Sequence, residues 1–423
     1  MKRLWNALNG NGGRELLIDT LSYGLAKAVP GILGLLSVVV FLRVTNESAY
    51  GRFALVTAII NVWITFSSGW FYQGLLRFGA QLTGPPEAFH RIMRAGLTLS
   101  GLAFLLSCLP HLWWETGLST ATGAGLAFGG VALVQTTLLA KLQASLRARS
   151  VLIVELLRSS ACFLFAVGLA WCMTDGPTAL LLGTALGYAL SVTYLWTRCT
   201  LPSPARSGLV AGPAETALVL RRIWGFGWPL SLWLAAQLML PLIDRTMMAT
   251  QLGLGETGKY AGLSDILTRC FSLAVFPVIQ AVYPRLAQLT DRQAHAEARS
   301  LLRRATLLLL LTGGALQPVL FLLRHQIVRF ALPVPDESFE VLVLPLSAGG
   351  FVWQAAMLLH KPLELAQKTH LMLGAIVAAV LLKAVGNCVL LPGLGVLGAA
   401  LATLLSGLSY CALCLWLGRR LSQ

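Results

Sequence analysis

The chain has 423 residues, of which 56% are hydrophobic and only 12% are charged, and its mean hydropathy is +0.73. Soluble domains carry about 25% charged residues, so this composition excludes an ordinary soluble protein. The net charge of +15 would fit a nucleic-acid-binding protein. That class is excluded as well, because the basic residues are spread over many short segments between long apolar blocks.

Twelve stretches are long and apolar enough to cross a bilayer as helices. In chain order they are 17–42, 51–76, 92–110, 121–146, 150–173, 178–197, 223–250, 257–283, 302–323, 341–360, 370–391 and 396–417. The longest connection is rich in proline and glycine, which suits a linker between two halves. We expect an all-α polytopic membrane protein with two six-helix bundles, residues 1–200 and 223–423, joined by a cytoplasmic linker over 201–222.

The distribution of lysine and arginine predicts the orientation of these spans. With both termini in the cytoplasm, 22 basic residues fall on the cytoplasmic side and five on the outer side. Such an excess is typical of cytoplasmic connections in multi-pass membrane proteins. The positive charge is therefore interpreted as a topology signal, and no nucleic-acid partner is expected.

A short repeat relates the two halves of the chain. Gly51-Arg52-Phe53-Ala54 opens the second span, and Gly258-Lys259-Tyr260-Ala261 opens the eighth. Because each half would hold an even number of spans, both halves enter the membrane from the same side. This pattern predicts a parallel repeat, which is a common plan for transporters.

Charged residues inside the predicted spans point to an aqueous interior. Lys27, Arg269 and Lys383 lie near the middle of spans 1, 8 and 11, and only Asp265 has the opposite sign at that depth. A lysine, arginine or aspartate at a span centre costs about 2.5–3.5 kcal/mol, so such residues usually face a cavity or a partner. Asp19 lies two turns from Lys27 and is its nearest acid. We expect Lys27, Arg269 and Lys383 to attract an anionic substrate.

Two acid–base arrangements leave alternatives open. Asp265 and Arg269 are four residues apart and could form a structural ion pair or belong to the substrate site. Asp244 and Arg245 are adjacent on one helix, so they cannot pair with each other. Asp244 is expected to tie span 7 to span 8 through Lys259 or free backbone N–H groups, with a proton-coupling carboxylate as the alternative. Arg245 is expected to point toward the cavity or the head groups.

No cluster with metal-ligand spacing is present, so neither a metal nor another cofactor is expected. Coupling to protons or sodium ions remains open.

Several short motifs resemble those of the polysaccharide transporter family, which includes O-antigen flippases. They are Trp228-Pro229, Asp244-Arg245, Gly258-Lys259-Tyr260-Ala261, Tyr50-Gly51-Arg52-Phe53-Ala54 and Gly74-Leu75-Leu76-Arg77-Phe78. The likeness extends over nearly the whole chain. One departure is the stretch SSGWFYQG before Leu75, which is more aromatic than the glycine-rich run usual in the family.

The resemblance implies two six-helix bundles around a central cavity, as in multidrug and toxin extruders. It implies that a polyprenyl-pyrophosphate-linked oligosaccharide for O-antigen, capsule or exopolysaccharide moves from the inner to the outer leaflet of a bacterial inner membrane. The partners would be this anionic lipid-linked glycan, membrane lipids and other membrane proteins of polysaccharide assembly. The chain would then not be an enzyme.

Two other functions remain open from the sequence. One is a multidrug-type ion antiporter, which would need a carboxylate near the cavity centre, and Asp265 is the candidate. The other is a membrane polymerase or ligase of the same glycans, which would use catalytic residues on the predicted outer loop 324–340.

Overall fold

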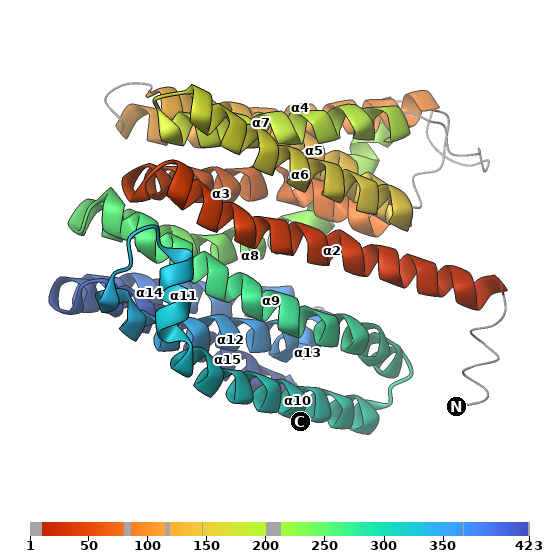
Figure 1. The fold of residues 1–423 in the computed structure, drawn as a ribbon. Coiled ribbons are helices and arrows are strands. Elements are labelled where there is room, and N and C mark those ends of the chain that lie inside the picture. The colour runs from red at the N-terminus through yellow and green to blue at the C-terminus, as the bar shows by residue number, and fades with distance from the viewer. Residues whose placement is uncertain are drawn as a thin grey trace. The chain divides into compact units, whose positions relative to one another are not determined.

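The computed structural model describes residues 11–79, 86–114, 119–145, 147–199, 213–366 and 368–421. These residues are almost entirely helical (Figure 1). The first half contains α2 (Asn11–Val44), α3 (Glu47–Phe78), α4 (Pro86–Trp114), α5 (Thr120–Ala144), α6 (Ala148–Cys172) and α7 (Gly176–Cys199). The second half contains α8 (Pro213–Gln251), α9 (Leu254–Asp291), α10 (His295–Leu322), α11 (Arg324–Ala331), η1 (Glu337–Leu342), α12 (Val343–Leu359), α13 (Lys361–Leu365), α14 (Thr369–Leu394) and α15 (Val396–Leu421).

Each of the twelve predicted spans corresponds to one long helix. In the described part of the chain, ten helices are long and apolar enough to cross a membrane. Helix α2 adds a shorter apolar stretch, Ala28–Val44, and α9 is a further long helix. The prediction of an all-α polytopic membrane protein is confirmed.

Several helices continue beyond the predicted spans into polar sequence, and three of them do so by seven residues or more. Helix α8 begins at Pro213, α9 runs to Asp291, and α10 begins at His295. Hydropathy does not detect such turns, because they are helical but too polar to lie in the bilayer core. Part of the predicted linker is therefore helix, and residues 201–212 lie outside the described part of the chain.

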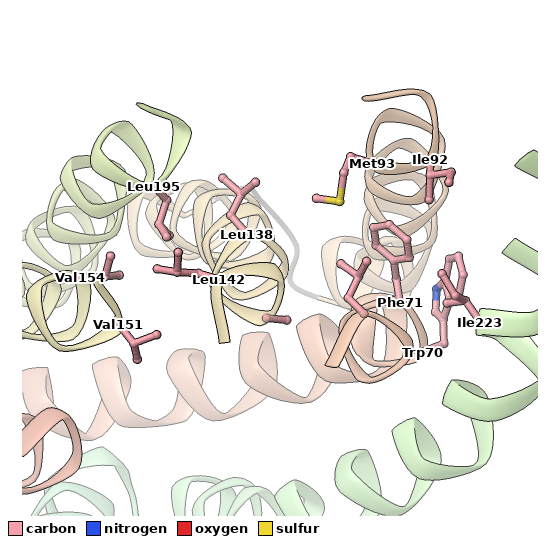
Figure 2. Close-up of a cluster of buried hydrophobic side chains, with 12 residues drawn as sticks. Trp70, Phe71, Ile92, Met93, Leu138, Leu142, Val151, Val154, Leu195 and Ile223 are labelled. Atoms are coloured by element: carbon pink, nitrogen blue, oxygen red, sulfur yellow. The ribbon is translucent and has the colours of Figure 1, made fainter. Parts of the chain in front are cut away.

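The chain divides into two compact units. The first comprises Met1–Gly34, Trp63–Met173 and Thr178–Ser231. Its core is a cluster of twelve buried side chains contributed by α3 to α8, including Phe71, Leu138 and Ile223 (Figure 2). Helices α6 and α7 pack backbone to backbone, because a Cβ on Gly183 would lie 2.3 Å from the backbone of Ala166. This is the close approach that small residues permit between membrane helices.

The second unit comprises Leu35–Val62, Thr174–Pro177 and Leu232–Gln423. Part of its core lies between α9, α10 and α12, where Ile279, Leu309 and Leu358 are buried. Helices α14 and α15 also pack against each other in this unit.

These units do not coincide with the two halves of the sequence. The first part of α3 joins the second unit, because its backbone touches α9 near Gly51 and Gly258. The first part of α8 joins the first unit, because a Cβ on Gly227 would lie 2.0 Å from the backbone oxygen of Trp70 on α3. Close helix contacts therefore override order along the chain.

Candidate functional site

Asp244 is a buried acid in the last two turns of α8. It lies seven residues before Gln251, where the helix ends, and is 3% exposed. A buried carboxylate is costly unless hydrogen bonds or an opposite charge compensate its lost hydration.

Three polar groups from three other helices donate hydrogen bonds to Asp244. The Tyr260 hydroxyl on α9 lies 3.0 Å from Oδ2, and the Thr403 hydroxyl on α15 lies 3.0 Å from the same oxygen. Asn387 Nδ2 on α14 lies 2.8 Å from Oδ1. Asp244 thus joins α8 to α9, as the sequence predicted, but through Tyr260 and not through Lys259.

Lys383 completes this site, which we call the Asp244 site. Its Nζ lies 2.8 Å from Asp244 Oδ2, and the residue is 2% exposed. The sequence placed only Asp265 as an acid at the depth of Lys383, whereas the structure pairs Lys383 with Asp244. The partner is 139 residues away in sequence, and only the packing of α14 against α8 brings the two together.

Asp265 has a different partner from the one that its spacing suggests. Arg245 Nη2 lies 2.7 Å from Asp265 Oδ1, and Arg245 Nη1 donates to the backbone oxygen of Ala54 at 3.0 Å. Arg269, one turn along the same helix, makes no ion pair with Asp265 in the part of the chain that the structure describes. Arg245 is thus held between α9 and α3.

Arg269 is the remaining cation of α9 at this depth. It is partly exposed, and no hydrogen bond or ion pair joins it to another described residue. Lys27 and Asp19 lie in α2, but their side chains are outside the described part of the chain. The structure therefore joins Lys383 to Asp244 and Arg245 to Asp265 in two neutral ion pairs, and Arg269 belongs to neither.

Lys259 holds a second, more exposed group of acids. Its Nζ lies 2.9 Å from Asp336, 3.1 Å from Glu256 and 4.0 Å from Glu47. Hydrogen bonds from Ser338, and then the bond from Lys259, lower the pKa of Asp336 below its ordinary value of 3.8. We call these four residues the Lys259 cluster.

Sequence reasoning missed Thr403 as a member of the Asp244 site. It lies in the apolar helix α15, where a threonine is unremarkable because its hydroxyl can bond to its own helix. Ala399 O lies 3.0 Å from the hydroxyl oxygen and is the alternative acceptor for its one proton. Asn387 was detectable, since it is one turn from Lys383 on α14. Asn387 Oδ1 is buried and has no hydrogen-bond partner in the described part of the chain.

A metal site is not apparent here. Among the described residues, no three His, Cys, Asp or Glu side chains gather closely enough to hold a metal ion.

Comparison with known proteins places the fold. No protein-family model matches the chain, and no curated protein matches its sequence. Solved structures do match. An inward-facing multidrug resistance MATE family transporter of the MOP superfamily aligns with a TM-score of 0.65 and 12% identity, over 96% of this chain and 94% of that one. The outward-facing form of such a transporter gives a TM-score of 0.66 and 13% identity, over 98% and 97% of the two chains.

A flippase is equally similar. The lipid II flippase MurJ, in an inward closed conformation, gives a TM-score of 0.66 and 12% identity, over 94% of this chain and 87% of that one. The chain has the twelve-helix transporter fold. At such low identity the likeness establishes the fold and leaves the cargo open.

Proposed function

We propose that the chain is a flippase for an anionic, lipid-linked oligosaccharide. The cargo would be carried on polyprenyl pyrophosphate and moved from the inner to the outer leaflet of a bacterial inner membrane by alternating access. The transporter fold supports this proposal, as do the motifs near Gly51, Asp244 and Gly258. One of the similar structures is a lipid II flippase.

The proposal rests on the balance of charged side chains in the second unit. Two acids at membrane depth, Asp244 and Asp265, are each neutralised by an ion pair. Arg269 is then a surplus positive charge among the described residues of α9. A surplus cation in a low-dielectric site attracts an anion such as pyrophosphate, and it disfavours a cationic drug.

The three predicted cations take different roles in this proposal. Arg269 would contact the anionic head group directly, and the role of Lys27 stays a prediction from the sequence, because its side chain lies outside the described part of the chain. Lys383 is held by Asp244 and reaches the cargo only after leaving that pair. A proton transferred to Asp244 would release Lys383. Proton coupling, the alternative role expected for Asp244, would therefore act by breaking this ion pair.

A multidrug antiporter is the second candidate, because MATE transporters share the fold. Recognition of a cationic drug would require an unpaired carboxylate at membrane depth. Asp265, the candidate for this role, is bound to Arg245. The flippase is therefore preferred.

A polymerase or ligase has less support. Its catalytic residues would come from the loop 324–340, where Arg324 and His325 both contact Glu340. His325 Nδ1 lies 2.6 Å from Glu340, and the histidine side chain is exposed. Among the described residues, no contact joins this pair to a further acid or to a nucleophile. The similar solved structures are transporters and flippases.

The decisive experiment locates the trapped intermediate. Deletion of the gene should leave lipid-linked glycan in the inner leaflet, and the wild-type gene should restore export. Arg269→Ala should abolish export while the protein remains in the membrane, and Arg269→Lys should retain part of it. Accumulation in the outer leaflet would favour the polymerase or ligase. Normal surface glycan combined with drug sensitivity would favour the antiporter.

A further inference from the structure

Two helices of the first unit meet at the aromatic stretch SSGWFYQG of α3. A Cβ on Gly227 of α8 would collide with the backbone oxygen of Trp70. A Cβ on Gly74 would collide with the side chain of Ile223 on α8. One turn beyond Gly227, Ser231 Oγ donates a hydrogen bond to a backbone oxygen of α3. Positions 223, 227 and 231 are four residues apart, so they form one face of α8, and α3 covers it.

A second face of α8 stays exposed beside this contact. Arg221, Trp224 and Trp228 follow one another at intervals of three and four residues, so their side chains lie along one side of the helix. Arg221 is exposed, and the two tryptophans keep 51% and 43% of their surface exposed. No hydrogen bond or ion pair joins Arg221 to another described residue. We call these three residues the α8 stripe.

The ring of Trp224 is held against α3. Its centroid lies 5.1 Å from that of Trp70, and the two rings meet edge to face at 61°. Trp70 is itself only 5% exposed, and its Nε1 donates to Ser67 O at 2.9 Å. The aromatic stretch of α3 therefore fixes one ring of the stripe, which reduces the side-chain entropy that is lost when a molecule binds there.

The α8 stripe is charged at one end and apolar at the other. Arg221 precedes the predicted span, which starts at residue 223, whereas Trp224 and Trp228 lie one and five residues inside it. At 1.5 Å per residue, the stripe extends about 10 Å along the helix axis. A lipid with an anionic head group has the same order of parts, with charge at the membrane surface and apolar groups below.

The charge around the stripe is positive. Residues 63–78 of α3 and 216–231 of α8 contain three arginines and no acid. The arginines, Arg77, Arg221 and Arg222, are all exposed. A guanidinium offers paired N–H donors that match the oxygens of a phosphate. This end of α8 therefore favours a phosphate-containing head group.

Contact with ordinary acyl chains does not account for the rings. In the described part of α4, in the same unit, the exposed large apolar side chains are all leucine: Leu99, Leu102, Leu105, Leu106 and Leu109. On the part of α8 in this unit, three of the four are aromatic: Trp224, Phe226 and Trp228, with Leu218. Flexible acyl chains pack well against leucine, whereas a rigid, methyl-branched isoprene unit gains more from a flat, rigid ring.

We propose that the α8 stripe binds the polyprenyl pyrophosphate carrier of the cargo. This rests on the proposed flippase function and names the part of the cargo that the stripe recognises. Arg221 pairs with the pyrophosphate, and Trp224 and Trp228 pack against the first isoprene units, which enter the membrane at that depth. Because the start of α8 is predicted to face the cytoplasm, the stripe meets the cargo in the leaflet from which it is exported. Its contacts are with the carrier, so binding should not depend on which glycan is attached.

Farnesyl pyrophosphate is a short probe for the head-group contact. Its binding is measured on purified full-length protein in lipid nanodiscs, in an Arg269→Ala background so that the proposed anion contact at Arg269 does not contribute. Arg221→Gln should weaken binding about 10-fold or more, because a hydrogen bond between charged groups is lost. Arg222→Gln is the matched control, since Arg222 is also exposed but lies over the Phe78 ring, 4.6 Å from its centroid. An equal loss in both variants would show general charge attraction and would overturn the proposal.

Dodecyl pyrophosphate, with a straight saturated chain, tests the contact with the tail. Protein with an intact stripe should bind farnesyl pyrophosphate more tightly, and Trp224→Leu combined with Trp228→Leu should remove this preference. Trp196→Leu is the control, because Trp196 is 57% exposed at the predicted cytoplasmic end of α7. If the preference is absent from the intact stripe, or if Trp196→Leu also removes it, the two tryptophans are general membrane anchors and the proposal is wrong.

Anionic phospholipid is the competing source of phosphate. Adding phosphatidylglycerol to neutral nanodiscs should leave farnesyl pyrophosphate binding nearly unchanged, and complete displacement would make the stripe an ordinary phospholipid site. In cells, the Arg221 and double tryptophan variants should lower export while the protein remains in the membrane. If deletion of the gene traps glycan but these variants bind and export like wild type, only the stripe proposal fails. If deletion traps no lipid-linked glycan in the inner leaflet, the proposed function fails, whatever the stripe binds in nanodiscs.

Discussion

The Asp244 site and the Lys259 cluster join helices of the same unit through acids and a lysine, yet they differ in burial. Asp244 and Lys383 are 3% and 2% exposed. Side chains in the Lys259 cluster keep between 16% and 36% of their surface exposed. Removing one partner of a buried pair costs about 3–5 kcal/mol, whereas an exposed pair contributes about 0–1 kcal/mol. Loss of one partner is therefore expected to be costly at the Asp244 site and nearly neutral in the Lys259 cluster.

The largest expected effect is at the Asp244 site. Lys383→Met leaves Asp244 charged and buried, so it should reduce the free energy of unfolding by about 3–5 kcal/mol. Asp244→Asn combined with Lys383→Met removes both charges and should recover much of this loss. Thermal unfolding of the purified protein in detergent measures both variants. A double variant less stable than Lys383→Met alone would contradict the assignment of a buried ion pair.

An intermediate effect is expected at Arg245. Arg245→Met removes the ion pair with Asp265 and the bond to Ala54 O, and hydrogen bonds to charged groups contribute about 1.5–3 kcal/mol. Asp265→Asn keeps the bond to Ala54 and should cost less. The same unfolding assay separates the two variants. If Asp265→Asn were the more damaging change, the Arg245–Ala54 contact would not be stabilising.

A smaller, pH-dependent effect is expected in the Lys259 cluster. Because the pKa of Asp336 is lowered, its bonds to Ser338 and Lys259 stabilise the fold above pH about 4, and this contribution is lost as the pH falls through the lowered pKa. Asp336→Asn should therefore cost less than about 1 kcal/mol at pH 7 and progressively less in acid. Unfolding temperatures across this pH range test the trend.

Glu337→Gln is the matched control for that trend, since Glu337 is exposed and adjacent. The prediction would be contradicted if the difference in unfolding temperature between wild type and Asp336→Asn grew as the pH fell.

The smallest effect on stability is expected at Arg269, where the effect on transport should be large. Arg269→Gln removes no hydrogen bond or ion pair to a described residue, so stability should change by less than about 0.5 kcal/mol. Export should nevertheless fall, because the surplus positive charge is lost. The two assays on one variant distinguish a transport residue from a structural one. A destabilised variant would show that Arg269 has a structural partner.

Much of the fold could be predicted from the sequence, because hydropathy reports directly which segments the bilayer accepts. All twelve spans correspond to long helices, and the repeat at Gly51 and Gly258 marked two helix starts that contact each other. The ends of α8, α9 and α10 were missed, since polar helical turns outside the bilayer carry no hydropathy signal. The assignment of the first part of α3 to the second unit follows from glycine contacts between helices that are far apart in the sequence, which hydropathy does not report.

The partners of the buried charges could not be predicted. Spacing along α9 suggested an ion pair between Asp265 and Arg269. The structure instead pairs Asp265 with Arg245 on α8, at 2.7 Å. Lys383 appeared to lack an acid because Asp244 is 139 residues away. The sequence alone determined which residues enter the membrane and where charge is placed along each helix, since both follow from local composition. Only the tertiary structure decided which charges neutralise one another, because that depends on which helix faces meet.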